Sequence, residues 1–198
     1  FLAERYVLQA ASSGQLQAKI LRLGNLSARS EDGEFQVNFS SNAFMGRLRA
    51  YHTVGYVPYE AMLGTMEFSP IDEVAKTVIL LSETPRENAV FHPVKPNRQL
   101  FAGAINCLNR MGINIQIAEQ DKFQQALVTA ASSPEKAEML QSMLAYQSVA
   151  DGKYVVFNGC DNTLTTQLLM RLGFQWSFTT WDYMEQFITA IRGLGFFD

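Results

Sequence analysis

The stretch FLAERYVLQAASSGQLQAKILRLGN, residues 1–25, decides the fold. Its first part predicts an amphipathic helix, because Leu2 and Tyr6 recur at helical spacing and Ser12-Ser13-Gly14 supplies a stop. Residues 17–23 then form a short run typical of a strand, which ends at a Gly-Asn pair. A helix that begins without a cap and leads directly into a strand is typical of the middle of an α/β fold. We therefore expect the natural sequence to continue upstream of residue 1.

Helices and strands continue to alternate up to residue 120. Apolar periodicity predicts helices over 35–51, 71–81 and 100–111, extended runs over 65–68, 89–94 and 113–117, and a loop over 54–64. Ser69, Pro70 and Asp72 predict how the second of these helices begins, with a cap, a proline in the first turn and a capping-box carboxylate. This order of elements predicts the α/β class.

Helices dominate from residue 121 onward. The pattern predicts them over 121–131, 134–147, 161–172 and 181–192, with a short apolar run at 154–157 between them. We therefore divide the chain into an α/β part, residues 1–120, and a mostly helical cap, residues 121–198.

Composition excludes several classes of protein. The 198 residues are 47% hydrophobic and carry a formal charge of −3, which suits one globular domain with or without a small subdomain and gives no support for nucleic-acid binding. No apolar run approaches the roughly 20 residues that span a bilayer. Cys107 and Cys160 fit neither a metal site nor a disulfide framework, so we interpret them as reduced thiols of a cytoplasmic protein.

Five segments carry a resemblance to a known family. Phe1–Glu4 resembles the helix that follows a catalytic Tyr-x-x-x-Lys motif, and Leu21–Leu26 resembles the strand and loop that pass a nicotinamide ring. With Asp32–Asn38, Glu67–Ala75 and Leu172–Trp176, the chain resembles the terminal thioester-reductase domains of nonribosomal peptide synthetases and the related carboxylic acid reductases. Both are extended short-chain dehydrogenases/reductases.

The resemblance implies the C-terminal portion of a Rossmann-like extended short-chain reductase fold with a mostly helical substrate-binding subdomain. NADPH (or NADH) then reduces an acyl or peptidyl thioester, held on the phosphopantetheine arm of a carrier protein, to an aldehyde or an alcohol. A tyrosine protonates the developing oxyanion and a lysine lowers the pKa of that tyrosine. The alignment puts this lysine immediately before Phe1, so the N-terminal half of the same domain is the implied partner and binds most of the cofactor.

The catalytic parts of such an enzyme are missing from the sequence. No G-x-x-G-x-x-G loop follows a strand, and the best candidate for Tyr-x-x-x-Lys, beginning at Tyr183, ends in Phe187. We therefore assign no catalytic residue to this chain and expect it to be inactive by itself.

The resemblance implies two groups of binding residues. Gly24, Asn25 and Leu26 face the nicotinamide and bind its carboxamide through backbone groups; the alternative is an ordinary strand-end turn, in which Gly-Asn is common. The second group is implied to line the thioester channel and consists of Asn38, Phe39 and Asn42. Phe39 would suit a hydrophobic core equally well.

Other polar residues have simpler interpretations. We expect Arg22 to form a surface salt bridge and Asp72 to be a carboxylate at a helix start, not a catalytic acid. His52 and His92 lie forty residues apart without a predicted partner, and Cys107 is expected to be packed, so neither a metal site nor a nucleophile is indicated. Several aromatic residues lie close together near the C-terminus, and we interpret them as core residues of the mostly helical cap: Trp176, Phe178, Trp181, Tyr183, Phe187, Phe196 and Phe197.

Two other functions remain open at this point. One is an extended short-chain reductase that acts on a free small substrate, such as a nucleotide sugar or a ketone. The other is a non-catalytic module that docks a carrier protein through its helices. A Gly-rich loop and a Tyr-x-x-x-Lys motif upstream would favour either enzyme over the docking module.

Overall fold

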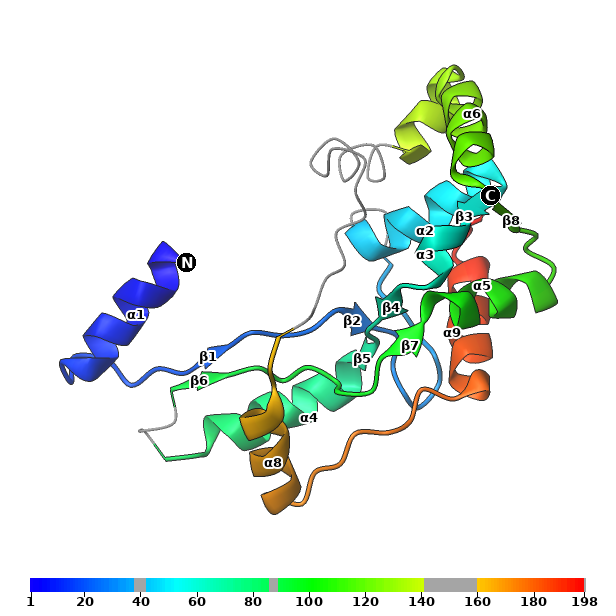
Figure 1. The fold of residues 1–198 in the computed structure, drawn as a ribbon. Helices are drawn as coiled ribbons and strands as arrows, with labels where there is room; N and C mark the ends of the chain where they lie inside the picture. Colours follow the sequence, from blue (N-terminus) through cyan, green and yellow to red (C-terminus); the bar gives the residue numbers. More distant parts are fainter. Residues whose placement is uncertain (38–41, 86–88, 141–159, 198) are drawn as a thin grey trace. The chain divides into compact units, whose positions relative to one another are not determined.

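The computed structural model describes residues 1–37, 42–85, 89–140 and 160–197, which form two compact units (Figure 1). Unit 1 comprises Phe1–Ser30, Glu67–Asn97 and Gly159–Phe178. Unit 2 comprises Glu31–Met66, Arg98–Asn158 and Thr179–Asp198. The units interleave along the chain, and unit 2 takes residues from both sides of residue 120. The functional division at residue 120 stays a prediction.

Unit 1 is built on parallel strand pairs with helices around them. Its elements are α1 (Leu2–Ser12), β1 (Ile20–Leu21), β2 (Leu26–Ser27), β5 (Ser69–Pro70), α4 (Ile71–Ser82), β6 (Val90–Phe91) and α8 (Thr163–Arg171). Strand β1 pairs with β6 and β2 pairs with β5, both in parallel. Parallel neighbours need a long crossover, and the chain between β1 and β6 is long enough to provide one and includes α4.

A small apolar core holds unit 1 together. Leu81 of α4, Phe91 of β6 and Leu169 of α8 are almost completely buried against one another. Half-buried residues pack around them, including Leu21 of β1 and Phe174. The core therefore joins the β1–β6 pair to helices α4 and α8.

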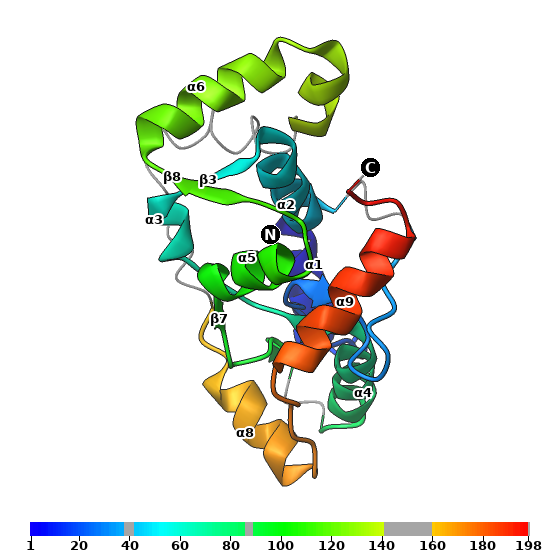
Figure 2. The same cartoon turned by 90° about the vertical axis from the view of Figure 1, so that its right-hand side faces the viewer.

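Unit 2 is richer in helix. Its elements are α2 (Ala43–Val54), β3 (Tyr56–Pro58), α3 (Tyr59–Met62), β4 (Thr65–Met66), β7 (Gln99–Leu100), α5 (Phe101–Arg110), β8 (Gln116–Ala118), α6 (Gln120–Ala131), a helix over 134–140 and α9 (Trp181–Gly193). Strands β3 and β8 pair in parallel and β4 and β7 antiparallel. Figure 2 shows β3 and β8 side by side, with α2 and α6 next to them.

Aromatic contacts organise the core of unit 2. The Tyr51 ring of α2 packs edge-on against Phe101 of α5, with 5.5 Å between ring centroids, and also against Phe123 of α6. Phe35 packs in the same way against Phe187 of α9 at 5.2 Å. Because each pair joins segments far apart in sequence, these rings fix the helices of unit 2 together.

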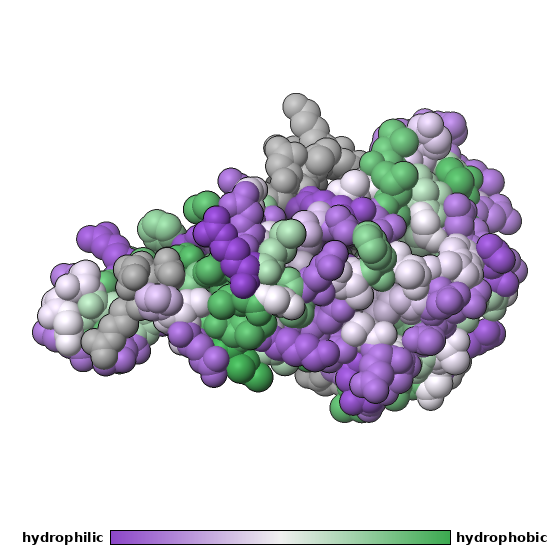
Figure 3. All heavy atoms as spheres, turned by 90° about the horizontal axis from the view of Figure 1, so that it is seen from below, coloured by the Kyte–Doolittle hydropathy of each residue, from purple (hydrophilic) through white to green (hydrophobic). Residues whose placement is uncertain are grey.

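The surface carries both hydrophobic and hydrophilic side chains. Figure 3 shows hydrophobic side chains in several separate groups among hydrophilic ones. Within unit 1, Leu164 and Met170 of α8 are 83% and 63% exposed. None of the helices among the described residues is both long enough and apolar enough to cross a membrane.

The structure corrects two sequence predictions before residue 65. The helix expected over 35–51 begins only at Ala43, because Phe35 is buried against Phe187 from a non-helical segment and Asn42 caps the helix. The loop expected over 54–64 contains β3 and α3 instead, since Tyr56–Pro58 pairs with β8. That pairing partner lies sixty residues away, so local pattern could not indicate it.

Two further expectations needed adjustment. Helix α4 forms where predicted, but Ser69 does not cap it, because the Ser69 hydroxyl bonds Glu67 and the Lys95 N–H instead. The strand expected over 113–117 is shifted to β8, because the Asn109 side chain binds both the N–H and the carbonyl of Ile115.

Five helices formed close to the predicted limits: α1, α5, α6, α8 and α9. Residues 134–140 are helical as predicted, whereas the rest of that prediction and the apolar run at 154–157 lie outside the described residues. The α/β class and the C-terminal Rossmann-like fold are confirmed by the comparisons given below.

Candidate functional site

The turn at Gly24–Leu26 is the best-organised polar feature of unit 1. It joins β1 to β2, and Glu67 receives the Asn25 backbone N–H at 3.1 Å through Oε2. The Asn25 carbonyl in turn accepts the Ser69 N–H at 3.1 Å. Both backbone groups of Asn25 are therefore engaged by the segment around β5, which fixes the conformation of the turn.

Gly24 is required by the same carboxylate. A Cβ on residue 24 would come within 2.0 Å of Glu67 Oε1, which is closer than any real contact. This close approach explains the glycine by packing alone. It also bears on the expectation that backbone groups bind a carboxamide, because the Asn25 N–H is already bonded within the protein. The Asn25 side chain is exposed and remains able to make such a contact.

The hydrogen bonds continue into the interior of unit 1. Glu67 is 9% exposed and Ser69 is fully buried, and the Ser69 hydroxyl donates to Glu67 Oε1. The same hydroxyl accepts the Lys95 N–H at 3.0 Å. A continuous series of hydrogen bonds thus runs from the Asn25 turn through Glu67 and Ser69 to Lys95, so the turn is held by a satisfied buried network.

Buried charges surround the end of this network. Lys95 is 1% exposed; burial lowers its pKa, while the Glu73 and Asp72 charges act in the opposite direction. The Glu73 Oε1 accepts the Ser177 N–H at 3.2 Å, and the buried Oε2 has no hydrogen-bond partner. No three His, Cys, Asp or Glu side chains of the described residues gather to hold a metal.

Asp72, in the first turn of α4, stabilises the loop that contains Ser30. Its carboxylate accepts the Ser30 N–H at 2.9 Å and the Ser30 hydroxyl at 2.6 Å. Partial burial raises the pKa of Asp72, but the hydrogen bonds from Ser30 and from the backbone N–H groups of Asp72 and Glu73 together outweigh it, so the net pKa is lowered. A group that stays ionised cannot be a general acid near neutral pH, which agrees with the helix-start interpretation.

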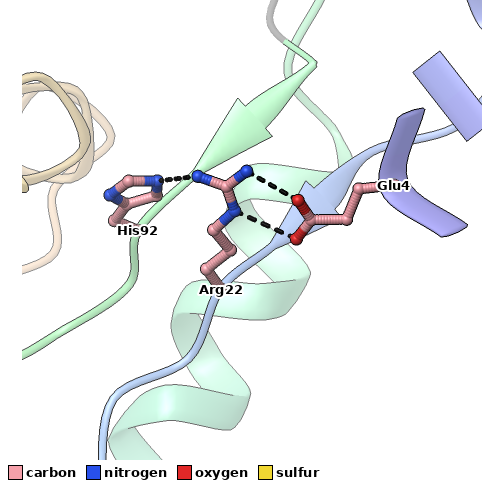
Figure 4. Close-up of polar contacts among 3 residues, drawn as sticks. All are labelled: Glu4, Arg22 and His92. Atoms are coloured by element: carbon pink, nitrogen blue, oxygen red, sulfur yellow. Dashed lines mark hydrogen bonds and ion pairs between the residues drawn. The ribbon is translucent and has the colours of Figure 1, made fainter. Parts of the chain in front are cut away.

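Arg22 forms the surface salt bridge that the sequence predicted (Figure 4). Its Nε and Nη2 donate to the two oxygens of Glu4 at 3.0 and 2.6 Å, which lowers the pKa of the Glu4 carboxyl. Its Nη1 lies 3.2 Å from His92 Nε2. Because a guanidinium only donates, Nε2 accepts, and the proton of the neutral ring sits on Nδ1, which lies 3.2 Å from the Asp161 carbonyl. His92 is thus a structural link.

The residues implied for a thioester channel are only partly described. Asn38 and Phe39 lie outside the described residues. Asn42 is half-buried in unit 2, and its Oδ1 accepts the Met45 N–H at 3.2 Å, as in a helix cap. This position explains Asn42 without a substrate, and its substrate role stays a prediction.

Sequence reasoning missed Glu67, Ser69 and Ser30 as organisers of the site. Glu67 lies 42 residues from Asn25, and Ser30 lies 42 residues from Asp72. One signal in the sequence could have indicated these contacts. It is the pair of acidic residues Glu67 and Asp72, which lie on either side of β5, directly before and at the start of α4. Buried carboxylates need donors, and backbone amides of a neighbouring turn are a common source.

The structure also tests the expectations for the cysteines and for the aromatic group near the C-terminus. Cys107 is buried, and burial raises the pKa of its thiol to about 11, whereas Cys160 is exposed. Most of the aromatic group near the C-terminus is core, with Trp176, Tyr183, Phe187 and Phe196 buried. Trp181 and Phe197 are half-buried, and Phe178 is 72% exposed.

Solved structures of reductase domains resemble the chain over its whole length. The structure of a thiolation-reductase di-domain from an archaeal non-ribosomal peptide synthetase is 27% identical, with a TM-score of 0.81, over 100% of this chain and 40% of that one. The terminal R domain from the myxalamid PKS-NRPS pathway is 23% identical, with a TM-score of 0.79, over 98% and 48%. The reductase domain of the aureusimine biosynthetic cluster is 20% identical, with a TM-score of 0.78, over 97% and 49%.

These matches confirm the resemblance and the fold. The chain corresponds to the C-terminal part of the reductase domain and spans less than half the length of each of the three structures. No family model and no curated protein matches the sequence.

Proposed function

We propose that this chain is the substrate-binding portion of an NAD(P)H-dependent reductase that releases a carrier-bound acyl or peptidyl thioester as an aldehyde or an alcohol. The observation that supports the proposal is the match of the whole of this chain to 40% of the archaeal di-domain, a structure described as a thiolation-reductase di-domain. A carrier protein with a phosphopantetheine-linked thioester is the partner that this arrangement supports.

The turn at Gly24–Leu26 is the part of this chain that would face the cofactor. A nicotinamide cofactor supplies the hydride when it is bound. The exposed Asn25 side chain is a primary amide, with one acceptor and two donors, and so complements the carboxamide of a nicotinamide. Glu67 holds the turn in place before binding, which reduces the entropy lost when the cofactor binds.

Residues outside this chain complete the proposed enzyme. The sequence has no Gly-rich phosphate loop and no Tyr-x-x-x-Lys, so the cofactor phosphates and the proton donor are assigned to the N-terminal half of the domain. Asn38, Phe39 and Asn42 are proposed to contribute to the thioester channel from unit 2. The two free thiols support a reducing, cytoplasmic compartment.

The test is NADPH oxidation by the intact protein that contains this chain. We expect oxidation with an acyl group on a carrier-protein phosphopantetheine, and none with the 198-residue chain alone. Oxidation that proceeds equally well with a free ketone or nucleotide sugar would favour the free-substrate reductase instead. Carrier binding without any oxidation would leave only the docking module.

A further inference from the structure

The side chain of Ser69 connects the turn at Gly24–Leu26 to the interior of unit 1. Ser69 is fully buried in β5. Its hydroxyl accepts the Lys95 N–H at 3.0 Å and donates to Glu67 Oε1. A hydroxyl carries one proton, and the Lys95 N–H can only donate, so that proton is directed to Glu67. The Ser69 hydroxyl is therefore held in one orientation, aimed at the carboxylate that binds the turn.

The carboxylate of Glu67 is held at both of its oxygens. Oε1 accepts the Ser69 hydroxyl, and Oε2 accepts the Asn25 backbone N–H at 3.1 Å. Rotation of the carboxylate moves both oxygens together, so the bond to Ser69 limits the orientations in which Oε2 can reach Asn25. Glu67 is 9% exposed, and water therefore has little access to replace the hydroxyl as a donor. The Ser69 hydroxyl thus controls how firmly the Asn25 N–H is held.

A second contact between Ser69 and Asn25 does not involve a side chain. The Ser69 backbone N–H donates to the Asn25 carbonyl at 3.1 Å, and Ser69 lies opposite Leu26 in the parallel pairing of β2 with β5. These backbone contacts do not depend on the side chain at position 69, so the turn stays next to β5 when that side chain is replaced. A substitution of Ser69 therefore tests the hydroxyl and not the pairing of the strands.

We propose that Ser69 is a positioning residue for cofactor binding, an inference that rests on the proposed function, in which the exposed Asn25 amide contacts the nicotinamide carboxamide. Ser69 has no exposed surface with which to touch a cofactor, and it acts through Glu67. Without the hydroxyl, Oε1 loses this donor and Glu67 orients the Asn25 N–H less strictly. The turn then occupies more conformations before binding, and ordering it on binding costs affinity.

The expected consequence is weaker binding of NADPH. Loss of one hydrogen bond that pre-organises a binding loop corresponds to about a three- to tenfold change in affinity. Ser69→Ala should therefore raise the Kd for NADPH by about this factor. Ser69→Thr retains the hydroxyl and should bind NADPH as the parent does.

Two measurements on the intact protein that contains this chain test the proposal. Fluorescence titration with NADPH gives the Kd, and hydrogen exchange, followed by mass spectrometry, reports how firmly the Asn25 N–H is held. Ser69→Ala should speed exchange in peptides that cover residues 24–26, and Ser69→Thr should restore the parent rate. If Ser69→Ala does not fold, Ser69→Cys provides a side chain of similar size with a weaker donor, and it should change both values in the same direction.

Thr77→Val is the matched control. Thr77 of α4 is also fully buried, and its hydroxyl donates to the Val74 carbonyl of the same helix at 2.7 Å. The substitution removes a buried hydrogen bond of unit 1 that includes neither Glu67 nor Asn25. NADPH binding and exchange at residues 24–26 should therefore match the parent.

The outcomes separate the role of Ser69 from the proposed function. A parent protein that binds no NADPH overturns the proposed function and the role of Ser69 with it. NADPH binding that is equal in the parent and in Ser69→Ala overturns the role of Ser69 alone. The same conclusion follows if Thr77→Val weakens binding as much as Ser69→Ala does, or if weaker binding in Ser69→Ala comes without faster exchange.

Discussion

The carboxylate of Glu67 occupies the space that a side chain on Gly24 would need, since Oε1 lies 2.0 Å from the Cβ position of residue 24. The same carboxylate accepts the N–H of the next residue, Asn25, and the hydroxyl of Ser69. The glycine and the buried acid thus form one unit that shapes the turn between β1 and β2.

Gly24→Ala should destabilise the protein by about 1–3 kcal/mol, because the new methyl group must displace a hydrogen-bonded carboxylate. Adding Glu67→Ala removes the obstacle, so the double variant should lose less than the sum of the two single losses. Urea unfolding of the four proteins measures this coupling. Gly103→Ala is the control, because a Cβ there meets nothing within 4 Å, and it should not destabilise. Additive losses would show that Glu67 does not set the requirement for glycine.

Asn25→Ala should raise the KM for NADPH of the intact enzyme several-fold and change kcat little, if the exposed amide binds the nicotinamide carboxamide. Arg22→Met is the comparison, because Arg22 is engaged with Glu4 and His92, and its KM should equal that of the parent. Steady-state kinetics with a carrier-bound thioester provide both values. Equal KM values for the two variants would remove Asn25 from the cofactor site.

The sequence was most informative where structure is local. Helices α1, α5, α8 and α9 could be predicted because apolar spacing and stop residues such as Gly112 and Gly173 act within a few positions, and both glycines have positive φ. Strand β3 was missed because Tyr56–Pro58 becomes a strand only through its pairing with β8. A pairing partner so far away in the sequence does not change the residue pattern of the segment itself.

The difference between local patterns and distant contacts also explains which residues of the candidate site could be predicted. Gly24 and Asn25 were found through a family resemblance, whereas the role of Glu67 depends on a contact across 42 residues. Ser69 looked like a helix cap because its neighbours Pro70 and Asp72 fit that pattern. In the structure, the Ser69 hydroxyl donates to the carboxylate of Glu67 and accepts the Lys95 N–H, so it does not cap α4.

Ser30→Ala should make the stability of the protein depend less on pH between pH 7 and pH 3. The pKa of Asp72 is lowered in the folded state by the hydrogen bonds from Ser30, so its stabilising contribution is present above the unfolded pKa of about 4. That contribution is lost as the pH falls through the lower folded value. Removing the hydroxyl raises the folded pKa toward the unfolded one and reduces the contribution at neutral pH. Thermal unfolding at pH 7 and pH 3 measures the effect: the variant should melt lower than the parent at pH 7, and the gap should narrow at pH 3. A gap that is constant with pH would mean that the Asp72 charge is not involved.

The two cysteines should react at very different rates with a thiol reagent. Burial raises the pKa of Cys107 to about 11, so almost no thiolate is present at pH 8, whereas Cys160 is exposed. We expect one rapid equivalent in the native protein and two in denaturant, measured by absorbance of the released chromophore. Cys160→Ser should abolish the rapid phase. Rapid labelling that survives in Cys160→Ser would show that Cys107 is accessible.

Gly33 provides a sharper test of backbone packing in unit 2. It has a φ of +74°, and a Cβ there would lie 2.6 Å from the Gln186 carbonyl carbon and 2.8 Å from the Phe187 nitrogen, both backbone atoms of α9. Gly112 has a similar φ of +86° but open space around its Cβ position. Gly112→Ala should therefore cost about 1 kcal/mol from backbone conformation, and Gly33→Ala should cost a further 1–3 kcal/mol from the clash. Urea unfolding compares the two.

A rescue variant separates this clash from the one at Gly24. Glu67 obstructs residue 24 with a side chain, so truncation relieves it, but Gln186→Ala leaves the backbone of α9 where it is. Gly33→Ala combined with Gln186→Ala should thus remain almost as unstable as Gly33→Ala alone. Substantial recovery would mean that α9 can move away from residue 33. The contact between Phe35 and Phe187 opposes such a shift, because both rings are buried and packed edge to face at 5.2 Å.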